Sequence, residues 1–196
     1  MILYGALVGT LLLVLSIDAG GEVVSLPKDQ AIYGANEQWK KMQTRLLLND
    51  RELVEILRGI GDTISIADLV QLEKAVQRLS ALQVPFSDLL PQDALLIDAQ
   101  HHSLLAENEY VRVMRAHLKV GETCPLHLHQ WPSVYLILSG DKFITHHQDG
   151  TAVAEEWGPG VYELPADTEL MGFTNCGTDD FEALCIELKK TLPNTK

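Results

Sequence analysis

The hydrophobic pattern of the chain changes about halfway along its length. Between residues 36 and 82, apolar residues recur every three or four positions, as in NEQWKKMQTRLLL and IADLVQLEKAVQRLSALQ. This spacing places apolar side chains on one face of a helix. From about residue 95, short runs rich in Val, Leu, Ile and Tyr are separated, at intervals of about 8–12 residues, by turns that contain Gly, Pro or Asp. The pattern predicts short helices followed by a β-sandwich or β-barrel.

Polar residues set the expected starts of the helices. Asn36 is suited to cap the first helix, since Asn is a favoured N-cap residue. Asn49 with Glu52, and Ser65 with Asp68, resemble capping boxes at the starts of the next two helices. Three short helices are therefore expected before the β region, packed either on that region or on a second copy of the chain in a homodimer.

The clearest strand alternation lies in VRVMRAHLKV. Val111, Val113 and Ala116 mark its apolar positions, whereas Arg112 and Arg115 are expected to face water. A strand of this kind belongs to a sheet with one buried face and one solvated face.

The first 17 residues, MILYGALVGTLLLVLSI, contain no charged side chain. The run is short for a membrane span and suits the apolar region of a signal peptide, although no basic residue precedes it and no clean cleavage site follows it. Residues 1–19 are therefore predicted to be a signal peptide or a membrane anchor, with a buried core segment as the remaining interpretation. An exported protein, periplasmic or secreted, is expected rather than a cytoplasmic one. Residues 20–90 then form a linker and the short helices.

Composition and charge narrow the choice of partners. The 196 residues are 46% apolar, enough for one domain with an extension. Asp and Glu number 27 against 15 Lys and Arg, for a net charge of −12, so nucleic acid is not expected as a partner. The cysteines, Cys124, Cys176 and Cys185, lack the spacing of a disulfide framework or a zinc site and are expected to be small buried or half-buried hydrophobes.

Two histidines carry the candidate chemistry. In GETCPLHLHQWPSVYLILSG, residues 121–140, His127 and His129 lie two positions apart, so on a strand both point to the same face. Neutral imidazoles suit Fe, Mn, Ni, Cu and Zn. A catalytic metal usually has three protein ligands and an open position, so the pair by itself is incomplete.

The spacing of Gly121, His127, His129 and Gly140 resembles the first sequence motif of the cupins, which are small jelly-roll β-barrels. The resemblance covers residues 95–190. It implies a mainly β fold, a cupin-type jelly-roll β-barrel with an N-terminal helical extension, in which both histidines face the interior of the barrel.

The chain also departs from the cupin pattern at two ligand positions. Ser133 stands where the motif has a glutamate, and Leu170 where the second motif has a histidine. Neither side chain can replace those ligands for a divalent metal. His147, Gln130 and Glu163 are the candidates for a substitute donor.

The remaining histidines are expected to be structural or exposed. His101 and His102 lie just before the first predicted strand and are expected at the surface, and His117 is expected to be structural.

Three interpretations of the pair remain open. His127 and His129 bind a divalent metal (Fe, Mn, Ni, Cu or Zn), or they bind a small polar molecule together with Ser133, Tyr135 and Gln130, or they are hydrogen-bonded remnants in a packed core. The first two suit an exported cupin-type protein that binds a small molecule, with a weak metal site on the histidines. The alternative is a metal-dependent oxygenase or isomerase with a third ligand from outside the family pattern, and a structural or dimerising barrel comes after it. No acid–base or nucleophile–base pair is evident, so the residues do not assign a catalytic activity.

Overall fold

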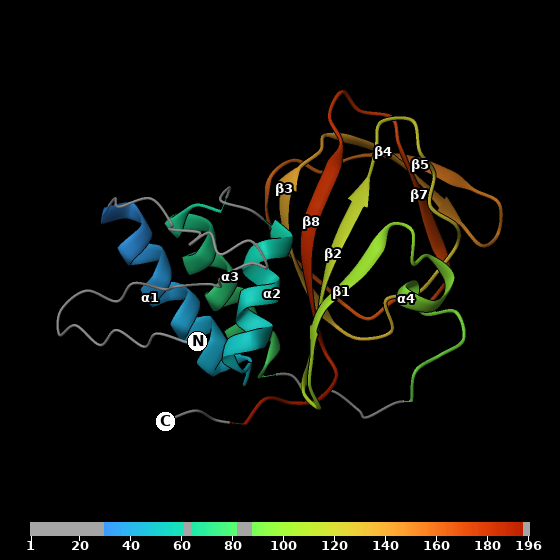
Figure 1. Ribbon diagram of the computed structural model, residues 1–196. Helices are drawn as coiled ribbons and strands as arrows, with labels where there is room; N and C mark the ends of the chain where they lie inside the picture. Colours follow the sequence, from blue (N-terminus) through green and yellow to red (C-terminus); the bar gives the residue numbers. More distant parts are fainter. Residues whose placement is uncertain (1–29, 61–63, 82–87, 194–196) are drawn as a thin grey trace, which may run out of the picture.

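The computed structural model describes residues 30–60, 64–81 and 88–193 (Figure 1). The helices are α1 (Gln30–Arg45), α2 (Asp50–Ile60), α3 (Ile66–Leu79) and α4 (Ala94–Ile97). The strands are β1 (His102–Glu107), β2 (Val111–Leu118), β3 (Ser133–Ser139), β4 (Lys142–His147), β5 (Ala152–Glu156), β6 (Gly160–Leu164), β7 (Met171–Asn175) and β8 (Phe181–Leu188). The expected signal peptide or anchor, residues 1–19, lies outside the described residues. Within them, no helix is both long enough and apolar enough to cross a membrane.

The strands form two antiparallel sheets that face each other. One has five strands in the order β1-β2-β8-β3-β6, and the other has three in the order β5-β4-β7. Strands that are distant in sequence are neighbours, since β8 pairs with both β2 and β3. The predicted combination of a mainly β domain with an N-terminal helical extension is confirmed.

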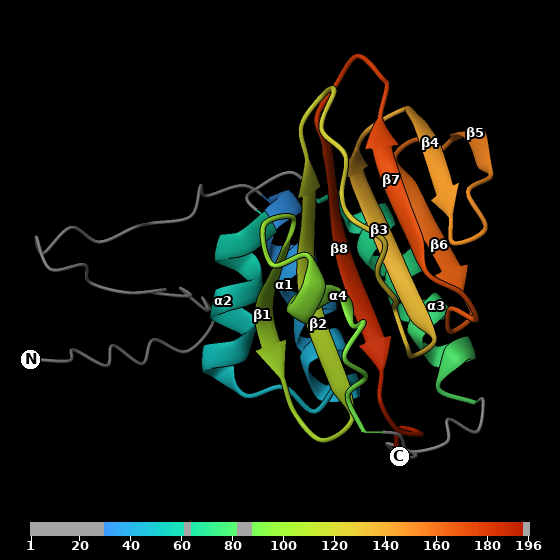
Figure 2. The ribbon, with the colours of Figure 1, turned by 90° about the vertical axis from the view of Figure 1, so that its right-hand side faces the viewer.

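Helices α1, α2 and α3 lie on the outer face of the five-stranded sheet (Figures 1 and 2). One buried apolar cluster joins the two layers. Its members include Trp39, Met42, Leu53, Ile56, Leu69, Leu72 and Val76 from the helices and Val111, Val113, Val134, Leu136, Leu184, Ile186 and Leu188 from the sheet. The helices therefore complete the core of the β domain, and the five-stranded sheet is buried on both faces.

This second buried face explains why one prediction for β2 was wrong. Arg112 was expected to face water, but its side chain is only 1% exposed. Val111 and Val113 point toward the helices, so Arg112 between them points into the barrel, where two carboxylates bind it. Arg115, the next basic residue on β2, pairs with Glu182 and stays partly exposed.

Two predicted capping boxes are present and one predicted helix start was wrong. The Asn49 side chain accepts a hydrogen bond from the Glu52 amide at 3.0 Å, and the Glu52 carboxylate accepts one from the Asn49 amide at 2.7 Å. Ser65 and Asp68 form the same arrangement ahead of α3. Helix α1, however, begins at Gln30 rather than at Asn36. No proline lies between Gln30 and Asn36, and a single Asn is too weak a signal to start the helix only at that residue.

Candidate metal centre

A cavity of about 280 Å³ lies between the two sheets. Its lining includes His127, His129, Ser133 and Tyr135, as the alternation along the predicted strands indicates. Gln130 does not line it. The Gln130 side chain instead accepts a hydrogen bond from the Leu90 amide at 2.7 Å and donates one to the Asp88 carbonyl at 2.8 Å.

A third histidine, His102, completes a cluster with the predicted pair. The ring centroid of His102 lies 4.8 Å from that of His127 and 5.2 Å from that of His129. The ring centroids of His127 and His129 are 5.2 Å apart. One ring nitrogen from each lies within 4.8 Å of the other two. The prediction that His102 is a surface residue was wrong, since only 7% of it is exposed.

Pairing between β1 and β2 makes room for His102 inside the barrel. His102 is the first residue of β1 and lies opposite Ala116 of β2, whose small side chain also lines the cavity. The burial of His102 thus depends on a contact between strands, which the local sequence around HHSLL does not show. The neighbouring His101 is also buried, at 8% exposure, so the surface prediction was wrong for it as well.

Each of the three rings is oriented through its Nδ1 atom. His102 Nδ1 donates to Asp98 Oδ2 at 3.1 Å, and His127 Nδ1 donates to the Pro125 carbonyl at 2.8 Å. His129 Nδ1 lies 2.8 Å from Glu187 Oε1. Metal-binding histidines usually hold a carboxylate or carbonyl with the nitrogen that does not bind the metal. This arrangement turns Nε2 of each ring away from its Nδ1 partner, and at His129 the Tyr135 hydroxyl lies 2.9 Å from that atom.

Helix α4 sets the positions of the histidines from outside the sheets. Asp93 caps its start and Asp98 its end. The Ala94 amide donates to the Leu128 carbonyl at 3.0 Å, which ties α4 to the segment between His127 and His129. The Asp98 side chain therefore reaches His102 from a helix that is itself fixed to the neighbouring ligand segment.

Strand β7 holds the other side of the same segment. The His127 amide donates to the Met171 carbonyl at 2.9 Å, and the Met171 amide donates back at 3.0 Å. A Cβ atom on Gly172 would lie only 2.8 Å from the Cys124 carbonyl oxygen, so the close approach requires glycine at this position. Met171 lines the cavity, whereas Leu170, at the expected position of the missing family histidine, does not.

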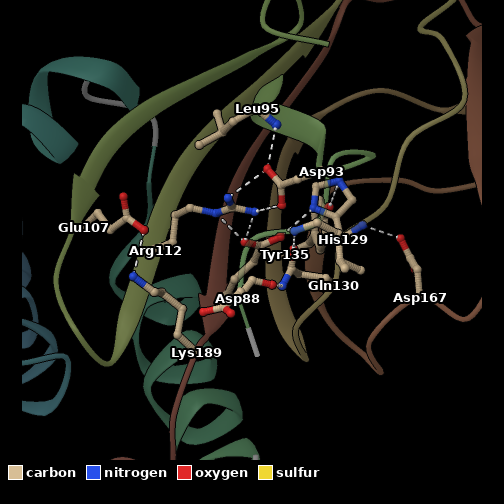
Figure 3. A network of polar contacts seen from close by, with 12 residues as sticks. Asp88, Asp93, Leu95, Glu107, Arg112, His129, Gln130, Tyr135, Asp167 and Lys189 are labelled. Atoms are coloured by element: carbon tan, nitrogen blue, oxygen red, sulfur yellow. Dashed lines mark hydrogen bonds and ion pairs between the residues drawn. The ribbon is translucent and has the colours of Figure 1, made fainter. Parts of the chain in front are cut away.

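Behind His129 lies a buried charge network (Figure 3). Arg112 donates to both carboxylate oxygens of Asp93, at 2.9 and 2.6 Å, and its Nε donates to Glu187 at 2.6 Å. Glu187 in turn contacts His129, whose Nε2 accepts a hydrogen bond from the Tyr135 hydroxyl at 2.9 Å. One guanidinium faces two carboxylates, so with His129 neutral and both carboxylates ionised the network carries a net charge of −1.

Burial dominates the protonation of the site. It lowers the pKa of His127 to about 4, helped by His102 and His129, and lowers the pKa of His129 to about 3. Burial also raises the pKa of Glu187 to about 7, in spite of Arg112, and that of Asp167 to about 6. Both histidines are therefore neutral near pH 7, the form that binds metals.

The three imidazoles fit a metal better than the other donor groupings among the described residues. Asp98, Cys124 and His127 lie close together, but burial raises the pKa of Cys124 to about 12, so its thiol keeps its proton. Cys185, near His129 and Glu187, has a pKa raised in the same way. Deprotonated thiols are the metal-binding form, so neither thiol is suited to the role.

The substitute donors considered for the pair lie elsewhere. His147 lines the cavity, but its Nδ1 is 3.1 Å from Glu169, and it is not part of the histidine cluster. Glu163 accepts a hydrogen bond from Arg78 of α3 at 2.7 Å and so faces the helical layer. Ser133, in contrast, has a buried hydroxyl with no hydrogen-bond partner among the described residues, and it lines the cavity.

No protein-family model matches the chain, and no curated protein is significantly similar to it. Solved structures similar to it include a cupin domain from Bordetella pertussis Tohama I, at 20% identity over 45% of this chain and 91% of that chain, with a TM-score of 0.41. Another is an RmlC-like cupin family protein from Methanocaldococcus jannaschii, at 20% identity over 48% of this chain and 85% of that chain, with a TM-score of 0.37. A predicted oxalate decarboxylase from Thermotoga maritima is 25% identical over 44% of this chain and 77% of that chain, with a TM-score of 0.33. In the part of the chain that the structure describes, the β domain consists of two antiparallel sheets, and His102, His127 and His129 line the cavity between them.

Proposed function

We propose that the protein is a metal-dependent enzyme of the oxygenase or isomerase kind, which acts on a small molecule held between the two sheets. The observation that carries this proposal is His102. It raises the number of clustered imidazoles from two to three, the usual number of protein ligands in a catalytic metal site. Fe, Mn, Ni, Cu and Zn all suit such ligands.

The protein side chains have separate tasks in this proposal. His102, His127 and His129 would hold the ion, and their Nδ1 partners keep the rings in place. A divalent ion held by these residues would act as a Lewis acid toward the substrate. The Ser133 hydroxyl is available to bind a polar group of the substrate.

Asp167 is suited to carry a proton. Its Oδ2 accepts a hydrogen bond from the His129 amide at 2.7 Å, and the residue lines the cavity. No hydrogen bond from a described residue occupies Oδ1, which can take a proton from a bound molecule. With a pKa raised to about 6 by burial, Asp167 can exchange a proton near neutral pH.

Metal analysis tests the proposal directly. We expect protein purified without chelator to hold about one equivalent of a divalent transition metal per chain. Loss of a residue that only orients a metal ligand typically weakens metal binding by about 10- to 100-fold. His102 would itself be a ligand, so His102→Gln should weaken metal binding by more than about 100-fold. His117→Gln, at a half-exposed histidine outside the cluster, is the control. Equal metal binding by wild type and His102→Gln would contradict the proposal.

A second candidate function is binding of a small molecule without chemical conversion. The unpartnered Ser133 hydroxyl in an otherwise largely apolar cavity favours it. Turnover separates the two functions. An oxygenase loaded with Fe(II) consumes dioxygen in the presence of substrate and an isomerase converts substrate without it, whereas a binding protein does neither.

We also propose that the protein is exported, on the basis of the uncharged run in residues 1–17. Fractionation of the native host and mass measurement of the N-terminus test this. A full-length product confined to the cytoplasm would contradict it.

A further inference from the structure

The end of the cavity formed by the three-stranded sheet has a chemistry of its own. Phe143 and Thr145 of β4 and Glu155 of β5 all line it, because Phe143 and Glu155 are paired in register and so share a face. Trp157, two residues beyond Glu155, lines it as well. This end therefore combines aromatic surface with one carboxylate.

One oxygen of the Glu155 carboxylate is available to a ligand. The Thr145 hydroxyl donates to Glu155 Oε2 at 2.5 Å, which fixes the side chain. Thr145 is almost completely buried, at 3% exposure, and Glu155 is half-buried. No described residue forms a hydrogen bond with Glu155 Oε1.

The Asp, Glu, Lys and Arg side chains that line the cavity are all acidic. Among the described residues that line it are two carboxylates, those of Glu155 and Asp167, but no Lys or Arg. Arg112, the nearest buried cation to His129, is fully engaged by Asp93 and Glu187. A bound anion would therefore meet like charges and no cationic partner away from the histidines.

We propose that the cavity selects a small aromatic or similarly apolar molecule that carries a positively charged amine. The amine binds Glu155 Oε1 at the end of the cavity that Trp157 also lines, and the opposite end of the molecule reaches the histidine cluster. Carboxylates form strong charge-assisted hydrogen bonds with ammonium groups, and aromatic faces attract cations. The apolar body of the molecule would contact side chains that include Leu118, Phe143, Leu164, Phe173 and Phe181. This inference rests on the proposed function only for the histidine end.

Three catechols with the same ring and different arms test the selection. The arms are aminoethyl, hydroxyethyl and carboxymethyl, so the probes differ in the charge of the arm. Binding is measured by calorimetry with Zn²⁺, which has no redox chemistry, and again with metal-free protein in chelator. We expect the amine to bind about tenfold more tightly than the alcohol, as a charge-assisted bond allows, and the acid to bind most weakly.

The variant Glu155→Gln tests whether Glu155 is the residue that selects the amine over the alcohol. The amide can still accept the Thr145 hydrogen bond, so the fold is kept, but the tenfold preference for the amine over the alcohol should disappear. Glu156→Gln, at the exposed next position of β5, should retain the preference. Binding of the acid as tightly as the amine, or an unchanged preference in Glu155→Gln, would overturn the proposal. If the wild-type protein did not bind Zn²⁺ but its metal-free form still preferred the amine over the alcohol, only the proposed function would be contradicted.

Discussion

Tyr135 contacts the nitrogen of His129 that would bind a metal, so a single substitution tests whether its hydroxyl competes with the ion. Its hydroxyl donates to His129 Nε2, the lone pair that a metal would use, so the hydroxyl competes with the ion. We expect Tyr135→Phe to bind metal as tightly as wild type or up to about tenfold more tightly, since a neutral hydrogen bond contributes on the order of 1 kcal/mol. Competitive titration against a coloured chelator measures this. Weaker binding by the variant would identify Tyr135 as a ligand.

The protonation of His127 gives a prediction for pH. Its pKa falls from 6.5 to about 4 on folding, chiefly through burial, so the unfolded chain binds a proton there before the folded protein does. Stability from this residue is complete above pH 6.5 and is lost as the pH falls toward 4. For metal-free protein, we expect the unfolding free energy of wild type minus that of His127→Gln to decrease by about 3 kcal/mol over this range.

Denaturant titrations of both proteins in chelator, at several pH values, check the pH prediction. The comparison with the variant matters because Glu187 and Asp167 act in the opposite direction. Their pKa values are raised on folding, so they stabilise the protein as the pH falls. Their contribution is common to both proteins and cancels in the difference. A difference that stays constant between pH 6.5 and 4 would show that His127 is not buried in neutral form.

Residues differ in how far the sequence could predict their roles. His127 and His129 could be placed on one wall because residues two apart in an extended chain share a face. The predicted strand itself is absent there, since the pair lies between β2 and β3 in a segment with isolated bridges only. His102 could not, because its burial comes from pairing with β2 and from α4, both distant in sequence. The sequence signals for a buried His102 were Asp98, four residues earlier, and the small residue Ala116 on the strand that pairs with it. Arg112 was misplaced because both faces of β2 are buried. Val111 and Val113 pack against the helices, so Arg112 points to the opposite face, which is the interior of the barrel and not solvent.

At the scale of elements, the contact between β7 and the segment 124–127 positions His127. A Cβ on Gly172 would meet backbone atoms: the Cys124 carbonyl oxygen at 2.8 Å, the Pro125 carbonyl carbon at 3.2 Å and the Leu126 nitrogen at 3.3 Å. Backbone atoms cannot rotate away as a side chain can. We expect Gly172→Ala to lower the unfolding free energy by roughly 1–3 kcal/mol, as overpacking does, and to weaken metal binding because His127 moves.

Gly158→Ala is the matched control, since a Cβ at Gly158 would meet nothing within 4 Å. Thermal unfolding and metal titration of both variants check this prediction. If Gly172→Ala kept wild-type stability and metal affinity, the contact with β7 would not determine the position of His127.

The elements themselves were predicted well where the signal is local. The capping boxes at Asn49 and Ser65 depend on four consecutive residues each, and both are present. The start of α1 was misplaced because an isolated Asn does not compete with helix propagation. Helix α4 was not predicted, since ALLI is a single turn whose caps, Asp93 and Asp98, also serve Arg112 and His102.

At the scale of the whole molecule, the helices and the β domain share one apolar cluster. Removal of a buried side chain from a helix should therefore destabilise the sheet as well. Leu69 of α3 is completely buried, and we expect Leu69→Ala to lower the unfolding free energy by about 2–5 kcal/mol, the usual cost of such a cavity. Amide hydrogen exchange should report the same loss in β8 as in α3, because the two unfold together.

Ile66→Ala is the control for this prediction, since Ile66 is on the same helix but 36% exposed. It should change the unfolding free energy by less than about 0.5 kcal/mol. Faster exchange in α3 with unchanged exchange in β8 would show that the helices unfold separately from the barrel. Because Val134, Leu184 and Ile186 contribute to the shared cluster from β3 and β8, the strands behind the histidine site, a joint loss of protection would mean that the helical layer also supports the candidate metal centre.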